Sequence, residues 1–401
     1  MRSNLRTGRA PSGRKGVIAV TGSALFSLFF GAGNITFPLS LGARAPGDVV
    51  VSLVGFLLTA VAVPFAGLLA IILFEGNYTA FFRRVGKVPG LLITLLLLAL
   101  MGPFGGIPRL ISLMFSTFTL YLPGMRLALF TPVACTIIFL CAYRKTGMAR
   151  LIGRYLAPLL VLSLAIIIVK GLLSPPPVAP SPGTTTPSGG FWYGLTRGYQ
   201  TMDLIASFFF ASLVYGTCAK RCRESNADLT PSELKRVIIS VAVRSGILGA
   251  TLLGLVYFGL GMVAAGHHPL LVDIPDPRLF AAIGQRVLGV AAGSVVSVAV
   301  ISACVTTAIG LTVICAEFLG SATKTGYTPS LLITLTTTGL VTCLEFDGIC
   351  NMLLPVLEVI YPTLFIVCFF NILHKTHAIA PIKAPVYLAT GVCCVIKFLG
   401  G

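Results

Sequence analysis

The amino-acid sequence predicts an all-α polytopic membrane protein with about eleven transmembrane helices. Hydrophobic residue types make up 56% of the 401 residues and charged types only 10%, whereas a soluble domain carries about 25% charged residues. The apolar residues also gather in long runs, and a helix needs about 20 of them to cross a bilayer. This composition disfavours a soluble enzyme, a coiled coil, a disordered chain and a disulfide-stabilised scaffold.

Eleven apolar runs are the candidate membrane spans, and their order sets the expected topology. The last run is short and carries Lys397. With all eleven crossing, the two ends of the chain lie on opposite sides of the membrane. The runs cover residues 16–41, 48–74, 89–121, 127–143, 151–173, 191–218, 236–265, 283–319, 328–344, 350–373 and 380–399.

The charge pattern predicts the orientation. The formal net charge of +17 comes from 29 basic and 12 acidic residues, and the basic ones occur in bursts between apolar runs. This alternation follows the positive-inside rule, so the basic segment 1–15 is expected in the cytoplasm and no nucleic-acid partner is expected. The 11 cysteines are scattered and lie mostly inside apolar runs. Cys218 and Cys222 are one helical turn apart, but no further Cys or His has metal-ligand spacing, so we expect no transition metal.

Residues 174–190 divide the spans into two groups of five. This segment is rich in Pro, Gly, Ser and Thr, lacks charge, and is expected to be an extracytoplasmic linker. The first five-helix unit is then 16–173 and the second 191–373, and a cytoplasmic loop with an additional C-terminal helix fills 374–401. Because five is odd, the second unit starts on the opposite side of the membrane, as in transporters with inverted repeats.

Two spans in matching positions are interrupted. The first contains Gly31-Ala-Gly-Asn-Ile-Thr-Phe-Pro38 and the sixth contains Thr196-Arg-Gly-Tyr-Gln-Thr-Met-Asp203. Glycine costs about 1 kcal/mol and proline about 3 kcal/mol inside a helix. The alternative is a simple kink from tight glycine packing. A matched pair of broken helices indicates a transporter binding site, where half-helix N–H groups bind an anion and unwound carbonyls bind a cation. An amino acid zwitterion needs both.

Several polar side chains near mid-membrane are candidates for function. Asp203 could hold a substrate ammonium, help bind a cation, or cap its own half-helix. Arg109 follows a third break at 102–109 and could meet a substrate carboxylate or pair with Asp203 or Glu358. Glu358, between two prolines, could couple protons, although a structural hydrogen bond is favoured.

The eighth span carries hydroxyl groups suited to a small alkali cation. Ser302 and Thr306 share one helix face, and Thr307 points about 100° away from Thr306. The alternative is that these hydroxyls bond back to their own helix.

Four motifs, in order over roughly residues 15–375, resemble the branched-chain amino acid:cation symporter family. They are Gly31-Ala-Gly-Asn-Ile-Thr-Phe-Pro-Leu39, Gly198-Tyr-Gln-Thr-Met-Asp203, Ala303-Cys-Val-Thr-Thr-Ala-Ile-Gly-Leu311 with Ala316-Glu-Phe318, and Pro355-Val-Leu-Glu-Val-Ile-Tyr-Pro362. The resemblance implies a LeuT-like fold of five plus five helices. It also implies uptake of leucine, isoleucine and valine with Na⁺, or with H⁺ in some members. Methionine would fit the same apolar pocket.

The resemblance also implies site residues. The substrate would be surrounded by Ala32, Gly33, Asn34, Tyr199, Thr201 and Asp203, with Arg109 as a further candidate from the third break. The cation would be bound by first-helix carbonyls at Gly31 and Ala32 together with Ser302, Thr306 and Thr307. No cofactor is expected. The protein is expected to be a monomer or weak homo-oligomer spanning the bacterial inner membrane.

Other function classes fit less well. An intramembrane aspartyl protease needs two facing acids in a G-x-G-D type motif, which the sequence lacks. An intramembrane serine protease needs a histidine inside the membrane, and all four histidines are in loops or at span edges. The chain is therefore not expected to be an enzyme. A channel or a non-transporting amino acid sensor of the same fold remains the alternative.

Overall fold

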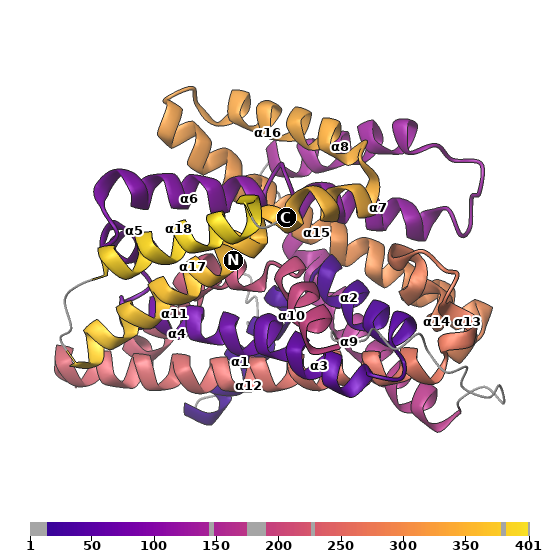
Figure 1. The fold of residues 1–401 in the computed structure, drawn as a ribbon, viewed down its shortest axis with the longest axis horizontal. Helices are drawn as coiled ribbons and strands as arrows, with labels where there is room; N and C mark the ends of the chain where they lie inside the picture. The colour runs from indigo at the N-terminus through magenta and orange to yellow at the C-terminus, as the bar shows by residue number, and fades with distance from the viewer. Residues whose placement is uncertain (1–13, 144–147, 175–189, 226–228, 378–381, 400–401) are drawn as a thin grey trace, which may run out of the picture.

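The computed structural model describes residues 14–143, 148–174, 190–225, 229–377 and 382–399, and every regular element in these ranges is helical. Most of the helices run side by side along the longest axis of the molecule, with α8 and α16 at one edge and α12 at the other (Figure 1). Helix α5 lies at one end of this axis, and α13 and α14 lie at the opposite end.

The first half of the chain supplies helices that match the first five apolar runs. The first run is split into two helices, the second contains a π-helical turn, and the third is split again. The elements are α1 (Arg14–Phe29), α2 (Ala32–Arg44), α3 (Val49–Leu57), η1 (Leu58–Ala62), α4 (Val63–Leu73), α5 (Tyr78–Arg83), α6 (Lys87–Met101), α7 (Gly106–Phe118), α8 (Leu127–Tyr143) and α9 (Met148–Leu173).

The second half follows the remaining runs. Its elements are α10 (Gly190–Gln200), α11 (Asp203–Ser225), α12 (Pro231–Gly266), α13 (His268–Leu271), η2 (Asp276–Arg278), α14 (Leu279–Leu288), α15 (Val290–Thr323), α16 (Tyr327–Thr342), α17 (Glu345–His377) and α18 (Lys383–Leu399). The predicted single span 283–319 is wrong at its start. Gly289, with φ of 86°, separates α14 from α15, because glycine adopts left-handed backbone that other residues rarely do.

The helices agree with a membrane protein, and the number of spans stays a prediction. Among the described residues, five helical segments are long and apolar enough to cross a membrane, or seven if each of two bent pairs is one span. The bent pairs are α1 with α2, at 68°, and α10 with α11, at 45°. These are the two spans in matching positions that were predicted to be broken. Apart from Ser174 and Gly190, the predicted linker 174–190 lies outside the described residues, as does nearly all of segment 1–15.

Helix α12 packs along both halves of the broken first span. At one crossing, a Cβ atom added to Gly42 of α2 would lie 2.1 Å from the carbonyl oxygen of Gly261 in α12. At another, a Cβ atom on Gly249 of α12 would lie 3.1 Å from the carbonyl oxygen of Gly22 in α1. The two backbones thus approach closely because these positions carry no side chain.

Gly42→Ala is expected to destabilise the folded protein by about 1 to 3 kcal/mol, the usual cost of forcing an extra carbon into a filled space. The measurement is a thermal unfolding curve in detergent. The matched control is Gly310→Ala in α15, where nothing lies within 4 Å of the added carbon. Equal unfolding temperatures for both variants would contradict the close contact between α2 and α12.

Candidate functional site

The two helix breaks lie against each other at the centre of the bundle. A Cβ atom on Gly33, in the first turn of α2, would lie 3.2 Å from Cα of Thr201 in the second break. Glycine is therefore what allows the two interrupted backbones to meet. Ala32 begins α2, and Gly31 precedes it as the N-cap residue.

Asp203 and Asn34 connect the two breaks through a tyrosine of α12. The Asn34 amide donates to Oδ2 of Asp203 at 2.7 Å, and the Tyr257 hydroxyl donates to the same oxygen at 3.0 Å. The Asn34 amide also donates to the Tyr257 hydroxyl. Its Oδ1 accepts from the backbone N–H of Gly31 at 3.3 Å, which orients the amide group. All three side chains are at most 2% exposed, so this network is shielded from water.

Asn34 and Tyr257 both bond to the same carboxylate oxygen of Asp203. Their hydrogen bonds do not use Oδ1, and no backbone N–H of α11 in the described part of the chain donates to the carboxylate. The capping role considered from the sequence is therefore not what the side chain does in this conformation. The Asp203 backbone N–H instead donates to the Thr201 hydroxyl at 3.3 Å.

The break between α10 and α11 is strained at Met202. This residue has φ of 61°, in the left-handed region that a side chain with a Cβ atom disfavours. Its N–H donates to the Tyr199 carbonyl at 3.1 Å, and the N–H of Thr201 donates to Gly198 at 3.2 Å, so a tight turn replaces the helical pattern. Backbone strain of this kind often accompanies functional sites.

Arg109 reaches the same region from α7. Its guanidinium group donates to the backbone carbonyl of Gln200, the last residue of α10, and the side chain is only 4% exposed. Within the described ranges it forms no ion pair, so the suggested pairings with Asp203 and Glu358 are absent from this conformation. Its Nε atom is buried without an acceptor. The cation therefore still lacks a counter-charge in direct contact.

Asp203 and Arg109 line one small cavity, which we call the central cavity. Its volume is about 60 Å³. Polar positions from the breaks line one part of it, and apolar side chains from α1, α6, α7, α11 and α15 line the rest. The lining residues are Leu28, Phe29, Gly31, Gly33, Asn34, Met101, Gly106, Arg109, Leu110, Thr201, Met202, Asp203, Ala206, Phe210, Thr307 and Leu311.

The hydroxyl groups proposed for a cation divide into two sets. Thr307 lines the central cavity together with Gly31. Ser302 and Thr306 are not among its lining residues, and the Thr306 hydroxyl donates back to the Ala303 carbonyl at 2.9 Å. Among the described residues, no group of three or more His, Cys, Asp or Glu side chains could hold a metal ion.

Two further candidates lie away from the central cavity. Tyr199 packs against Tyr361 of α17, with ring centroids 4.7 Å apart. Glu358 is a half-buried residue of α17 that lines neither the central cavity nor the larger cavity described next. The structure therefore brings together Gly31, Gly33, Asn34, Arg109, Thr201, Asp203 and Thr307 of the predicted set.

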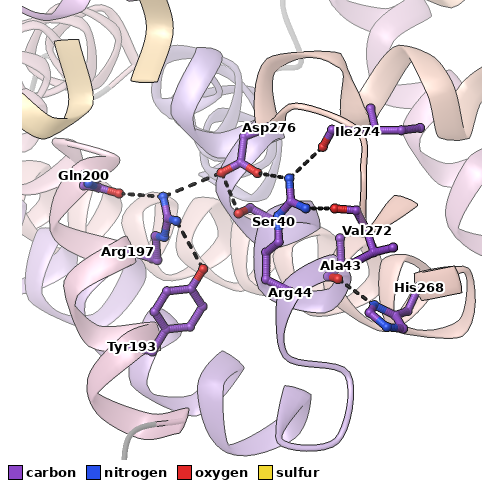
Figure 2. Close-up of polar contacts among 10 residues, drawn as sticks. All are labelled: Ser40, Ala43, Arg44, Tyr193, Arg197, Gln200, His268, Val272, Ile274 and Asp276. Carbon is purple, nitrogen blue, oxygen red and sulfur yellow. Dashed lines mark hydrogen bonds and ion pairs between the residues drawn. The ribbon is translucent and has the colours of Figure 1, made fainter. Parts of the chain in front are cut away.

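A second, larger cavity lies at the end of the bundle where α2 ends and α10 begins. It has a volume of about 500 Å³, and we call it the Asp276 cavity. Asp276 lies between two guanidinium groups there, at 3.2 Å from Arg44 and 3.6 Å from Arg197 (Figure 2). The lining residues are Arg44, Ala45, Tyr193, Arg197, Pro275, Asp276, Asp347, Cys350 and Asn351.

Asp276 and its two ion-pair partners, Arg44 of α2 and Arg197 of α10, form what we call the Asp276 cluster. The cluster connects α2 and α10 to the segment that follows α13. The Ser40 hydroxyl of α2 donates to Oδ2 of Asp276 at 2.7 Å, and Arg44 also donates to the carbonyls of Val272 and Ile274 (Figure 2). His268 forms a hydrogen bond with the Ala43 carbonyl at 2.6 Å. These contacts hold the C-terminal part of α2 against the segment 268–276 at this end of the bundle.

The sequence reasoning missed Tyr257, Arg197 and Asp276. Tyr257 lies inside the long apolar run of α12, where a tyrosine carries no distinctive signal. Arg197 lies in the polar insert of the sixth span, and the sequence predicted no role for it. Asp276 lies in the loop Asp273-Ile-Pro-Asp-Pro277, whose acids and prolines mark a turn and do not identify a partner.

The fold belongs to a known class, the LeuT-like architecture with two broken helices. The structure resembles Mhp1, a nucleobase-cation-symport-1 family transporter, in a closed conformation with a TM-score of 0.62 at 15% identity, over 94% of this chain and 82% of Mhp1. It also resembles a manganese transporter of Eremococcus coleocola, with a TM-score of 0.57 at 13% identity, over 99% of this chain and 89% of that one. At these identities the likeness concerns the fold.

The family follows from the sequence comparison. The family described as branched-chain amino acid transport protein matches residues 14–401, so the chain belongs to this family. The branched-chain amino acid transport system 3 carrier protein of Pseudomonas aeruginosa is 30% identical over 394 residues, 96% of this chain and 87% of the carrier. The branched-chain amino acid permease BrnQ of Salmonella typhimurium is 29% identical over 350 residues, 86% of this chain and 77% of the permease.

These comparisons confirm the resemblance that the four motifs carried, and they confirm the fold class. The family and the relatives are named as transport proteins, carriers and permeases, so the expectation that the chain is not an enzyme is also confirmed. The chain is an integral, multi-pass membrane transporter.

Proposed function

We propose that this protein imports large neutral aliphatic amino acids by symport with Na⁺. The substrates are L-leucine, L-isoleucine and L-valine, with L-methionine as a further member. The names of the relatives support this substrate class. The observation that carries the proposal is the central cavity, where a carboxylate and a guanidinium group line an otherwise mostly apolar space without pairing with each other.

An amino acid zwitterion carries a counter-charge for each of the two charged groups that line this cavity, Asp203 and Arg109. Its ammonium group would donate to Oδ1 of Asp203, the oxygen that the Asn34 and Tyr257 hydrogen bonds leave free. Its carboxylate would accept from Arg109. Buried charges are costly unless they are paired, so the bound zwitterion would satisfy both groups at once.

The apolar lining supports an aliphatic side chain. Phe29, Met101, Leu110, Phe210 and Leu311 are among the residues that line the cavity. Such a surface favours leucine over a polar or charged amino acid by the free energy of burying apolar area, about 25 cal/mol per Å². It would separate leucine from valine only weakly, because one methylene group is worth about 1 to 3 kcal/mol in a pocket.

Binding requires the helices around the cavity to move. A volume of about 60 Å³ is well below the roughly 300 to 1,000 Å³ of small-molecule sites. Movement of helices around a fixed central site is what alternating access demands. With the N-terminus in the cytoplasm of the bacterial cell, as the basic segments predict, the Asp276 end faces outside and is closed in this conformation.

The test of the proposal is radiolabelled leucine uptake into proteoliposomes under an imposed Na⁺ gradient and, separately, an imposed H⁺ gradient. Concentrative uptake with Na⁺, inhibited by isoleucine, valine and methionine but not by lysine, is the expected result. Uptake that follows the H⁺ gradient alone would contradict Na⁺ as the coupling ion. Leucine binding by folded protein without accumulation would contradict transport itself.

Thr307→Val is expected to raise the Na⁺ concentration for half-maximal uptake by about tenfold. Thr307 lines the central cavity with Gly31, and a hydrogen bond to a charged group is worth about 1.5 to 3 kcal/mol. The measurement is leucine uptake as a function of Na⁺ concentration. Thr312→Val is the matched control, since the Thr312 hydroxyl donates to the Ala308 carbonyl of its own helix at 2.7 Å. The same Na⁺ dependence in both variants would remove Thr307 from the cation site.

A further inference from the structure

The Asp276 cavity has the size and the charges of a binding site of its own. Its volume of about 500 Å³ falls within the range of small-molecule sites, unlike that of the central cavity. Arg44, Arg197 and Asp347 line it, and Asp347 and Asn351 are exposed, so the cavity reaches the surface. Cationic and anionic groups therefore face one accessible space.

The two arginines of the Asp276 cluster are held differently. Arg44 pairs with Asp276 at 3.2 Å and also donates to two backbone carbonyls, which occupies its guanidinium group in holding the loop. Arg197 lies 3.6 Å from Asp276, beyond ordinary hydrogen-bond length, and its hydrogen bonds go to uncharged groups. These partners are Oε1 of Gln200 at 3.2 Å and the Tyr193 hydroxyl at 3.1 Å. Of the two arginines, Arg197 is therefore the one better able to bind a further carboxylate.

Arg197 is also linked to Arg109 through shared partners, of which Gln200 is drawn beside Arg197 in Figure 2. The Gln200 side chain accepts from Arg197, and the Gln200 backbone carbonyl accepts from Arg109. The centroid of the Phe37 ring lies 5.9 Å from Cζ of Arg197 and 6.0 Å from Cζ of Arg109. Phe37 is fully buried, and the two arginines line different cavities. Phe37 and Gln200 therefore separate a guanidinium group at the surface cavity from one at the centre.

We propose that the Asp276 cavity is a capture site for the carboxylate of an incoming amino acid, with Arg197 as the binding group. When the half-helices α2 and α10 move apart and Phe37 is displaced, the carboxylate leaves Arg197 and binds Arg109 at the central cavity. This inference rests on the proposed function, because it takes an amino acid as substrate and the Asp276 end as the outer one. It adds a second site to the pathway, about one helical turn from the central one along α10.

The test compares transport in the two directions. Leucine transport is measured in right-side-out and in inside-out membrane vesicles containing wild-type protein or Arg197→Gln. The KM from the outer side is expected to rise about tenfold, as for the loss of one hydrogen bond to a charged group. The KM from the inner side is expected to stay within about twofold. Arg197→Lys is expected to recover most of the outer affinity because it keeps the charge.

Two further measurements separate capture from a purely structural ion-pair cluster. Inhibition of uptake by 3-methylbutylamine, which is leucine without its carboxylate, is expected to be the same in wild type and Arg197→Gln. Arg278→Gln is the control, because Arg278 donates to Thr119 at 3.3 Å at the same end without lining the cavity.

An equal rise of KM in both directions, or an outer KM raised as much by Arg278→Gln as by Arg197→Gln, would overturn the capture site. So would an unchanged outer KM in folded Arg197→Gln. These outcomes presuppose that wild-type vesicles transport leucine. If they do not, the proposed function has failed, and that failure is visible before any variant is compared.

Discussion

Replacing Asp203 by asparagine is expected to lower kcat/KM for leucine uptake by about 100-fold. The substitution keeps the size of the side chain and removes the charge that the proposed site offers to the ammonium group. Loss of one partner of a buried, hydrogen-bonded charge pair costs about 2 to 5 kcal/mol. At 1.4 kcal/mol per factor of ten, this corresponds to roughly 30-fold or more.

The control for this variant is Asp273→Asn, which removes an exposed carboxylate from the loop at the Asp276 end. A second readout is inhibition by 4-methylpentanoate, which is leucine without its ammonium group. Its inhibition constant is expected to be similar in wild type and Asp203→Asn. Unchanged leucine uptake by Asp203→Asn would place the carboxylate outside the binding site, and equal loss of affinity for both compounds would assign it a structural role.

Replacing Arg109 by glutamine is expected to reduce leucine uptake by a similar factor. The guanidinium group is buried, donates to the Gln200 carbonyl and is left without an ion pair among the described residues, so the substrate carboxylate would be its counter-charge. The effect of losing that charge is again about 2 to 5 kcal/mol. The measurement is the concentration dependence of leucine uptake.

For Arg109, the matching test uses an analogue of leucine that lacks the carboxylate instead of the ammonium group. Inhibition by 3-methylbutylamine is expected to be retained in Arg109→Gln, since that compound has no carboxylate to lose a partner. Arg109→Lys keeps the charge but not the planar, multiply donating group, so an intermediate affinity is expected. Full leucine uptake by Arg109→Gln would show that the carboxylate is bound elsewhere.

The broken helices could be predicted from the sequence because the residues that interrupt them act locally. Glycine, asparagine and proline between Gly31 and Pro38 cannot continue an apolar helix without cost, and the polar insert before Asp203 has the same effect. The contacts across the breaks depend on tertiary packing. The sequence offered three roles for Asp203, and the position of Tyr257 in α12 determines that one carboxylate oxygen is already occupied.

The cation candidates show a second limit of sequence reasoning. Helical spacing fixes the angle between Thr306 and Thr307 but not the absolute rotation of α15. In the structure, Thr307 is the one that reaches the central cavity, while Thr306 bonds back to its own helix. The start of α15 was missed because a glycine in a sequence does not reveal its φ, and Gly289 has a positive one.

The strained turn at Met202 has a consequence for how the molecule divides its time between conformations. A residue with a side chain pays about 1 to 2 kcal/mol to adopt left-handed backbone. Any conformation that returns Met202, with its φ of 61°, to the right-handed region recovers this energy and gains about 5- to 30-fold in relative population. The backbone of one residue thus lowers the equilibrium population of the conformation described here, relative to any conformation in which Met202 is right-handed.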